Sequence, residues 1–358
     1  MTVFIAMDSF KGSMTSEEAN HHVARAFQEE GFSTVTQVVA DGGEGSIAAF
    51  IHQGAQSILL STVDSLKRPI QAEVAYLPSE RTVVIETASA SGIQFGGHPL
   101  ETSSIGTGQL IKEAIQTLNI DNVILMLGGT GTIDGGIGMG EALGVQYYHH
   151  QTKLTNVTGK DLKQITHIDD SLLKRQLNGI HFFVGSDVTA PLTGPMGAVY
   201  NFGPQKGLHN DECDDYEQMM LYYAQLISTN LHEGDGAAGG IGFFCRHFLN
   251  AEFQSGFQYI YRHHAIDTNS IDFVITGEGR CDHQTWLGKW PSQIIHTLAK
   301  PTFILTGQNQ TILSQVPSEV KGIYSIIQDD EPLEEILSQG PVVYHSQTTC
   351  SYIIVGAS

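Results

Sequence analysis

Five short apolar runs in this chain each end in a glycine-rich turn that carries an acidic residue. The runs cover residues 3–7, 34–40, 123–127, 181–185 and 273–276, and their turns contain Asp8, Asp41 with Glu44, Asp134, Asp187, and Glu278 with Asp282. Short β-rich runs that end in glycine and lead into a helix pattern are typical of open α/β sheets. Such sheets bind ligands outside the carboxyl ends of their strands. Acids gathered at that edge favour Mg²⁺ and phosphate chemistry over a hydrophobic pocket.

Charge and length restrict the class of protein. The 358 residues allow two domains with ample cores, and 41% apolar with 16% charged residues predicts a globular chain. A net charge of -20 argues against a nucleic-acid binder, whose footprint would be a basic patch. A nucleotide enzyme remains compatible if Mg²⁺ and a few cations neutralise the charge locally. Four of the 18 Lys and Arg residues lie in glycine-rich segments, and we expect them to face phosphate: Lys11, Lys206, Arg280 and Lys289.

The cysteines and the hydropathy pattern predict a cytoplasmic protein. Cys213, Cys245, Cys281 and Cys350 are scattered, without C-x-x-C pairs or zinc spacing, which favours reduced thiols. The N-terminus enters a strand at once instead of a signal peptide. No apolar run approaches the roughly 18 residues that span a membrane.

Strands and helices alternate along most of the chain. Thr15 and Glu18 form a capping-box pattern for a first helix that ends near Gly31. A hairpin over 70–88, turning at 78–81, interrupts the β-α rhythm. We expect strands near 3–8, 34–40, 57–63, 122–127, 271–276 and 301–306, and further helices near 46–53, 106–118, 134–143, 211–230, 237–249 and 289–299.

This order predicts two α/β domains. Residues 1–62 and 265–358 are expected to form a Rossmann-like or flavodoxin-like parallel-sheet domain built from both termini. Residues 63–264 are expected to form a second, mixed α/β domain inserted in it.

Three helix starts are candidate anion sites. The 8–13 turn offers backbone N–H groups, a helix dipole and Lys11 to an anion, or is simply a capped turn. The 41–45 loop can bring two carboxylates close to a ligand or metal, or is a structural glycine turn. The hydroxyls of 102–107 can hold a carboxylate or phosphate, or act as N-caps.

Two later segments carry further polar groups. The 15 residues of 187–201 have the length of a functional loop; they begin with Asp187-Val188-Thr189-Ala190-Pro191-Leu192 and lead into Phe202-Gly203-Pro204-Gln205-Lys206-Gly207. Residues 277–289 hold the densest polar cluster of the chain, directly after a strand with a buried pattern. A Walker-type P-loop is absent from the sequence, and the one G-x-G-x-x-G match, at 234–239, does not follow a strand as a dinucleotide fingerprint would.

Taken together, the motifs resemble the bacterial type I glycerate kinase family. They occur in that family's order and span nearly the whole chain: Ile5-Ala6-Met7-Asp8-Ser9-Phe10-Lys11-Gly12, Ala40-Asp41-Gly42-Gly43-Glu44-Gly45, Asp134-Gly135-Gly136, Asp187-Val188-Thr189, Phe202-Gly203-Pro204-Gln205-Lys206-Gly207, Gly236-Ala237-Ala238-Gly239-Gly240 and Gly277-Glu278-Gly279-Arg280 through Gly288-Lys289. The chain departs from the family pattern at Met7, Ile133, Ala190 and Cys281. The resemblance implies ATP-dependent phosphorylation of glycerate, usually to 2-phosphoglycerate, in a cleft between two α/β domains.

Phosphoryl transfer needs positioning and charge neutralisation, and several residues compete for each role. Asp8 or Asp187 would accept the proton of the substrate hydroxyl, and Lys11, Arg280 or Lys289 would stabilise the γ-phosphate. One or two of Asp41, Asp187, Glu278 and Asp282 would bind Mg²⁺. The remaining expected ligands of ATP are Ser9, Gly42, Gly43 and Glu44, beside Asp41, Glu278, Arg280 and Asp282. The glycerate carboxylate would be held by Lys206, by Arg280, or by the helix start with Ser103, Ser104 and Thr107.

Two other functions fit the same residues. The chain could phosphorylate a different small hydroxy acid, or it could be a nucleotide or sugar-acid sensor that lost turnover. The partners expected from sequence are glycerate and ATP, without nucleic acid or membrane. The sequence leaves the oligomeric state open, with a homodimer as one outcome.

Overall fold

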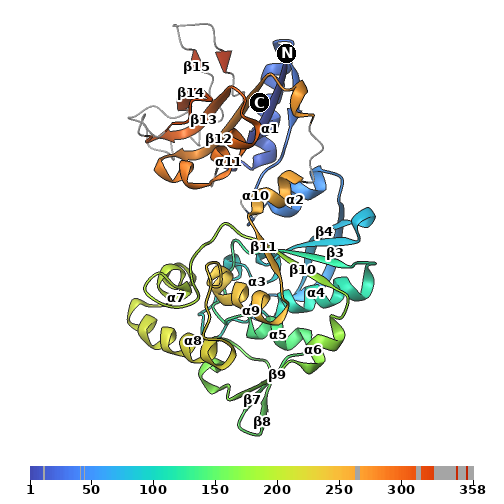
Figure 1. Ribbon diagram of the computed structural model, residues 1–358, viewed down its shortest axis with the longest axis vertical. Helices are drawn as coiled ribbons and strands as arrows, with labels where there is room; N and C mark the ends of the chain where they lie inside the picture. The colour runs from blue at the N-terminus through green and yellow to red at the C-terminus, as the bar shows by residue number, and fades with distance from the viewer. Residues whose placement is uncertain are drawn as a thin grey trace. The chain divides into compact units, whose positions relative to one another are not determined.

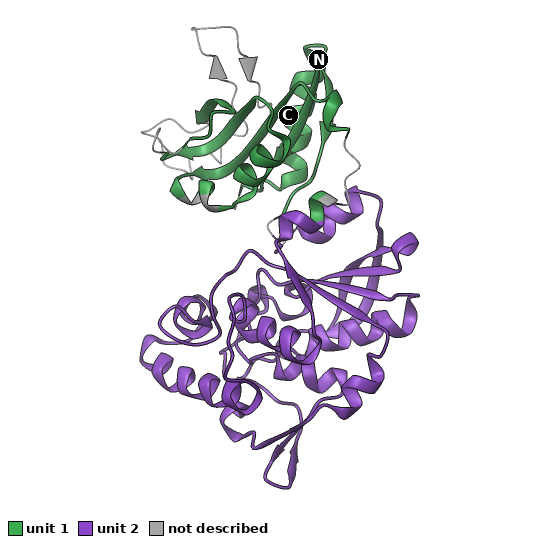
Figure 2. Ribbon diagram, viewed as in Figure 1, with its two compact units in different colours: residues 1–40, 260–358 green, residues 41–259 purple. Residues whose placement is uncertain are grey.

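The chain divides into two compact units in the computed structural model, which describes residues 1–10, 13–40, 42–43, 45–262, 267–311, 316–325, 344–345 and 352–353. The first unit contains residues 1–40 and 260–358, and the second contains residues 41–259 (Figures 1 and 2). Both units are α/β, so the predicted fold class of two α/β domains is confirmed.

The sheet of the first unit is fully parallel and has the strand order β14-β13-β12-β1-β2. Numbered along the chain, this is the flavodoxin-like order 2-1-3-4-5. The flavodoxin-like part of the prediction is therefore confirmed. The strands are β1 (Thr2–Met7), β2 (Ser33–Thr36), β12 (Phe273–Cys281), β13 (Thr302–Asn309) and β14 (Val320–Ser325), with the short pair β15 (Tyr344–His345) and β16 (Tyr352–Ile353) forming a separate ribbon.

Among the described residues, helices α1 and α11 flank this sheet. Helix α1 (Ser16–Glu29) packs Ala19, Val23 and Ala24 on the face that also holds Ile5 of β1. Helix α11 (Trp290–Leu298) packs on a second cluster around Cys281, Ile295 and Ile304. The capping box is confirmed, because the Glu18 amide donates to Thr15 Oγ1 at 3.2 Å while Glu18 Oε2 accepts from the Thr15 amide at 2.8 Å.

The sheet of the second unit is mixed, with the order β11-β10-β6-β5-β4-β3. Its first four strands run parallel to one another, whereas β4 is antiparallel to both β5 and β3. The predicted hairpin is confirmed as β4 and β5, which are joined by a turn over Pro78–Glu80. The strands are β3 (Gln56–Val63), β4 (Pro69–Leu77), β5 (Thr82–Glu86), β6 (Asn122–Met126), β10 (His181–Gly185) and β11 (Glu252–Gln254).

One large apolar core joins this sheet to the helices of the second unit. The helices are α2 (Ser46–His52), α3 (Ala88–Ser91), α4 (Ile105–Thr117), α5 (Ile137–Leu143), α6 (Ser171–Gln176), α7 (Ala198–Phe202), α8 (Cys213–Ile227), α9 (Ile241–Phe248) and α10 (Gly256–Arg262), whose last residues belong to the first unit. A small antiparallel sheet of β7 (Gln146–His149), β8 (Thr152–Leu154) and β9 (His167–Asp169) completes it. Among the described residues, none of these helices is long and apolar enough to cross a membrane.

The first crossing between the units lies at 40/41, earlier than the 62/63 boundary that we predicted. The prediction treated the 57–63 strand as the third strand of a parallel opening. In the structure, β3 pairs antiparallel with β4 over eight residues, from Gln56 opposite Tyr76 to Val63 opposite Pro69. Because this hairpin is local, it draws the preceding helix α2 into the second unit as well.

Candidate functional site

The first unit places its polar turns at a topological switch point. The chain runs from β1 to β2 on one side and from β12 to β13 on the other, so the loops after β1 and β12 diverge. Ligands of open α/β sheets bind in the crevice at such a point. Asp8 and Ser9 follow β1, and the Asp8 amide donates to Gly277 O of β12 at 2.9 Å. The two predicted motifs therefore meet at one edge of this unit.

Glu278 is the buried acid of this edge. It is 4% exposed, and its Oε1 accepts from the hydroxyl of Thr285 while its Oε2 accepts from Lys289 Nζ at 3.2 Å. Burial raises the pKa of Glu278, and the Thr285 hydroxyl and the Lys289 ammonium oppose that rise. The Lys289 side chain remains 42% exposed. Lys289 can therefore neutralise Glu278 and still face an anion in solution.

The remaining described groups of this edge differ in exposure. Arg280 is exposed, Asp282 and Ser9 are partly buried, and the Ser9 amide donates to Asp8 Oδ1 at 2.7 Å. Cys281 is fully buried, and burial raises the pKa of its thiol to about 11, so a thiolate nucleophile is disfavoured. Lys11, predicted to face phosphate, lies outside the described residues.

The second unit has its own glycine-rich edge, at the carboxyl ends of β6 and β10. Gly128 N donates to Gly42 O at 3.1 Å, and Leu127 N donates to Gly185 O at 3.2 Å. A Cβ on Gly128 would lie 2.4 Å from the Cα of Gly43, so glycine is required there for the backbones to approach.

This placement corrects one expectation. We predicted that the 41–45 loop would share an edge with the 8–12 and 278–289 loops in the domain built from both termini. Gly42 and Gly43 instead pack on the sheet of the second unit. Asp41 and Glu44 themselves lie outside the described residues.

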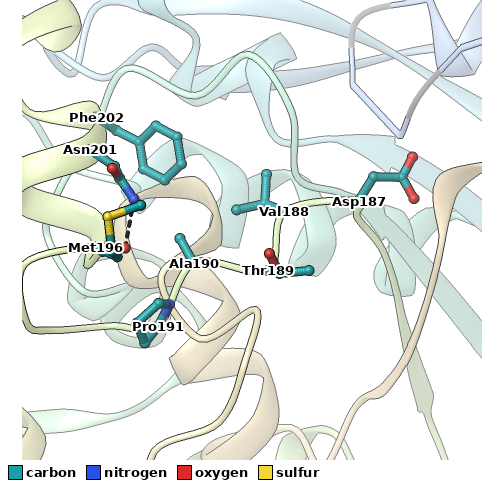
Figure 3. A pocket seen from close by; sticks show the side chains of 8 residues that line it. All are labelled: Asp187, Val188, Thr189, Ala190, Pro191, Met196, Asn201 and Phe202. Carbon is teal, nitrogen blue, oxygen red and sulfur yellow. Dashed lines mark hydrogen bonds between the residues drawn. The ribbon is translucent and has the colours of Figure 1, made fainter. Parts of the chain in front are cut away.

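Asp187 follows β10 at this edge and opens onto a cavity of about 370 Å³. Its side chain is exposed. Figure 3 shows the cavity lining, which is apolar except for Asp187, Thr189 and Asn201. The other lining residues are Val188, Ala190, Pro191, Met196 and Phe202. The cavity is open to solvent, and its volume would admit a small molecule.

Helix α8 and a glycine turn hold the cavity loop in place. Glu217 of α8 is buried, and its Oε1 accepts from the Gly194 amide. Gly236 N donates to Ala190 O at 3.0 Å, and a Cβ on Gly236 would lie 2.2 Å from Pro191 O. We did not single out Glu217 from the sequence. It lies on the same apolar face of its helix as Cys213, and an acidic residue on such a face was the available signal.

Lys206 lies inside the second unit. Its residue is only 8% exposed, and its Nζ donates to Thr132 O at 3.1 Å. The same Nζ lies 5.9 Å from the centroid of the Phe202 ring, and Phe202 lines the cavity. Burial lowers the pKa of Lys206 to about 7, and the charge of Asp134 opposes that shift. The amine is therefore poised between its two protonation states near neutral pH.

Asp134 organises the interior around Lys206. It is fully buried and accepts four hydrogen bonds, from the Ser104 amide at 2.7 Å, the Ser104 hydroxyl at 2.8 Å, the Gly136 amide at 3.1 Å and the Gly138 amide at 3.2 Å. Its burial raises its pKa, and these donors oppose that rise. Its position after the six turn residues 128–133 of a glycine-rich run was the available sequence signal, but we assigned it no role.

The predicted anion site at the start of α4 is occupied by protein groups. Ser103, Ser104 and Thr107 are fully buried. Ser104 binds Asp134, Ser103 Oγ accepts from the Ile105 amide at 3.3 Å, and Thr107 Oγ1 lies 2.7 Å from Ser91 Oγ. These hydroxyls are hydrogen-bonded inside the fold, but Ser104, the N-cap residue of α4, makes no side-chain capping hydrogen bond, so the alternative of an N-cap is not seen for it either.

Within the part of the chain that the structure describes, a magnesium ion would find few protein ligands at any one place. Among the described residues, no group of three or more His, Cys, Asp or Glu side chains could enclose a metal ion. Magnesium bound with a nucleotide needs only one or two carboxylates, because waters and phosphate oxygens complete its shell. Exposed Asp187 and partly buried Asp282 meet that requirement, each in its own unit.

Comparison with known proteins gives one consistent family. Residues 3–350 match the family described as "Glycerate kinase family". A glycerate kinase of Bacillus subtilis (strain 168) is 34% identical, with 94% of this chain and 92% of the relative covered. A glycerate 2-kinase of Escherichia coli (strain K12) is 35% identical over 84% of this chain and 82% of the relative. The crystal structure of a protein assigned as glycerate kinase 2 of Salmonella typhimurium LT2 has a TM-score of 0.79 at 31% identity, covering 95% of this chain and 94% of that one.

Proposed function

The chain belongs to the glycerate kinase family, and we propose that it transfers the γ-phosphoryl group of ATP to a hydroxyl of glycerate. The product is phosphoglycerate, and we propose 2-phosphoglycerate because the Escherichia coli relative is named a glycerate 2-kinase. The observation that carries the proposal is the cavity beside Asp187, which joins a carboxylate to a pocket of small-molecule size.

We assign glycerate to the second unit. The apolar part of the cavity suits a three-carbon backbone, and Asn201 and Thr189 offer hydrogen bonds to hydroxyls. The Lys206 ammonium lies 5.9 Å from the centroid of the Phe202 ring, which lines the cavity, and we propose that it neutralises the glycerate carboxylate. An ammonium that is already desolvated loses little further hydration when it binds an anion, so the pair would be strong.

We assign the ATP phosphates to the first unit, at the switch point between β1 and β12. Lys289 and Arg280 are the described cations of this edge, and Asp8 and Ser9 supply the turn after β1. Lys289 stands as N-cap residue of α11, where the helix dipole adds to its positive charge.

Asp187 is the proposed base. As the exposed carboxylate of the cavity it can accept the proton of the glycerate hydroxyl, while the cations reduce the charge that develops on the transferred group. When Mg²⁺ is bound with the nucleotide, it neutralises phosphate charge and holds the phosphates in one conformation. Asp187 or Asp282 would hold it. We place the reaction in the cytoplasm, in keeping with the free thiols of Cys213, Cys245 and Cys281.

An ADP-release assay over a panel of small hydroxy acids tests the proposal. Turnover should be highest with glycerate, should require added Mg²⁺ or Mn²⁺, and should stop in excess EDTA. Phosphorus NMR with proton coupling then identifies which oxygen carries the phosphate. A different best substrate would replace glycerate by another hydroxy acid, and ATP binding without turnover on any acid would identify a sensor.

A further inference from the structure

Strand β3 ends the sheet of the second unit with an edge that lacks the usual protection. It runs for eight residues, Gln56–Val63, and pairs with β4 in continuous register. No strand of the described residues pairs with its outer side. Natural edge strands are kept short, or carry charges, proline or bulges that prevent edge-to-edge pairing. Strand β3 has none of these, and its central Leu59 is 66% exposed.

As the described residues form them, the other ends of the two large sheets are short strands or carry a charge. Strand β2 is four residues long, β11 is three residues long and begins with Glu252, and β14 carries Lys321. The difference is notable in a chain whose net charge is -20, because two such chains repel one another at most surfaces. An uncharged strip of eight residues is a place where two copies can meet without like-charge contact.

We propose that β3 pairs antiparallel with β3 of a second copy of this chain, around a two-fold axis at Leu59. Such an axis, perpendicular to the sheet, keeps the solvent face of both copies on the same side. Directly opposite residues of an antiparallel pair point to the same face, so the register must join residues of equal parity. With Leu59 on the axis, Leu59 lies opposite its own copy, Ser57 lies opposite Ser61, and Ile58 lies opposite Leu60.

This register matches each side chain with a compatible one. On the solvent face, the exposed Leu59 pair is flanked by small hydroxyl residues, and on the other face Ile58 meets Leu60, which already contact the apolar core. Cross-strand apolar pairs of this kind stabilise sheets. An extended peptide of another protein could add to the same edge, but the strand itself supplies a partner of the right length, charge and parity.

Sedimentation of the full chain and directed cross-linking test the proposal. The wild type should sediment at twice the 38.9 kDa chain mass. Leu59→Cys should form an oxidation-dependent dimer on a denaturing gel that is reversed by dithiothreitol, because the two Cβ atoms would be neighbours. Leu226→Cys, on an exposed position of α8 in the same unit, is the matched control and should give only the wild-type background.

Leu59→Lys supplies the complementary result. Two ammonium groups would face each other on the axis, so this variant should sediment at monomer mass, whereas Leu226→Lys should keep the dimer mass. Retained ADP release by Leu59→Lys would show that it folds. A monomeric wild type at all concentrations, a Leu59→Lys variant that stays dimeric, or a Leu59→Cys variant that does not cross-link would each overturn the proposal.

Discussion

At the carboxyl-end edges of both sheets, strands are followed by glycine-rich turns that carry an acidic residue. The contacts that hold these turns in place differ between the two units. In the first unit, the turn after β12 is held by charge, because buried Glu278 is bound by Lys289 and Thr285. In the second unit, the turn after β6 is held by backbone contact, because Gly128 packs against Gly42 and Gly43.

That difference leaves different groups available at each edge. The edge with the ion pair offers Lys289 and Arg280, which can bind phosphate, and the buried Glu278 carboxylate pairs with Lys289. The glycine-packed edge leaves the Asp187 carboxylate exposed beside a cavity, and the buried Lys206 holds its ammonium 5.9 Å from the centroid of the Phe202 ring that lines this cavity. A strand followed by glycine and an acid therefore predicts a functional edge, but it does not predict which charge the edge presents.

The largest effect should come from Asp187→Asn. Asparagine keeps the size and removes the charge, so the fold should survive, while kcat should fall by about 10²–10⁴ because the base is lost. Steady-state kinetics at saturating ATP and glycerate measure this. Asp215→Asn, an exposed acid on α8, should behave as wild type.

The metal dependence of the same variant separates two roles. If Asp187 acts as base, the Mg²⁺ concentration for half-maximal rate should not change. If it binds the metal, that concentration should rise. A kcat within threefold of wild type would exclude both and leave Asp187 as a turn residue.

Lys206→Met should act mainly on glycerate. Loss of a charge-assisted contact should lower kcat/KM for glycerate by about tenfold to a hundredfold, with little change in KM for ATP. In the wild type, kcat/KM for glycerate should fall as pH rises through about 7, the pKa of Lys206, because the amine loses its charge. Exposed Lys160→Met is the control, and an alkaline limb that persists in Lys206→Met would assign the titration to another group.

Lys206 also makes stability depend on pH. Its pKa is 10.5 ordinarily and about 7 in the fold, so the unfolded chain binds more protons between these values. Stability of the wild type relative to Lys206→Met should therefore rise with pH over this window. Urea unfolding of both proteins at the two ends of this pH window measures the difference between their free energies of unfolding. A difference that does not change with pH would contradict burial of the amine.

Lys289→Met should affect both rate and stability at the other edge. Loss of the ammonium should lower kcat at least about tenfold if it stabilises transferred charge. It also removes one of the two groups that oppose the raised pKa of Glu278 and leaves only the Thr285 hydroxyl, so that pKa should rise further above the ordinary 4.5. The variant should lose stability relative to wild type as pH rises above that value. Lys321→Met in the same unit is the control, and an unchanged kcat would return Lys289 to a structural role.

The smallest effect should separate two glycines. Gly128→Ala places a Cβ 2.4 Å from the Gly43 Cα and should destabilise the second unit by about 1–3 kcal/mol. In Gly279→Ala the nearest atom would be the Phe10 Cα at 4.0 Å, so this change should be nearly neutral. Thermal unfolding, followed by circular dichroism, compares the stabilities of the two variants. Equal losses of stability would mean that the close approach of Gly128 to Gly43 does not require glycine.

The sequence by itself determined the local elements and most of the chemistry. The capping box at Thr15, the 78–81 turn and the alternating strands and helices depend on neighbouring residues, so their patterns are legible without a structure. The order of the motifs was enough to indicate the family. The acids and cations of 278–289 were identified because they follow a strand directly.

Only the tertiary structure decided which edge each turn joins and which polar groups face solvent. Strand β3 has the same local pattern whether it pairs with a parallel or an antiparallel neighbour. Because it pairs antiparallel with β4, it belongs to the second unit, and the boundary between the units precedes the Gly42 loop. In the sequence, Ser104 belongs to a helix start that could bind an anion. In the structure, its hydroxyl donates a hydrogen bond to Asp134, thirty residues later. The sequence predicted that Lys206 would face an anion, but it could not show that the side chain is buried and that its ammonium donates to Thr132 O. Pairing, burial and pKa depend on contacts between residues far apart in the chain, and local patterns do not contain them.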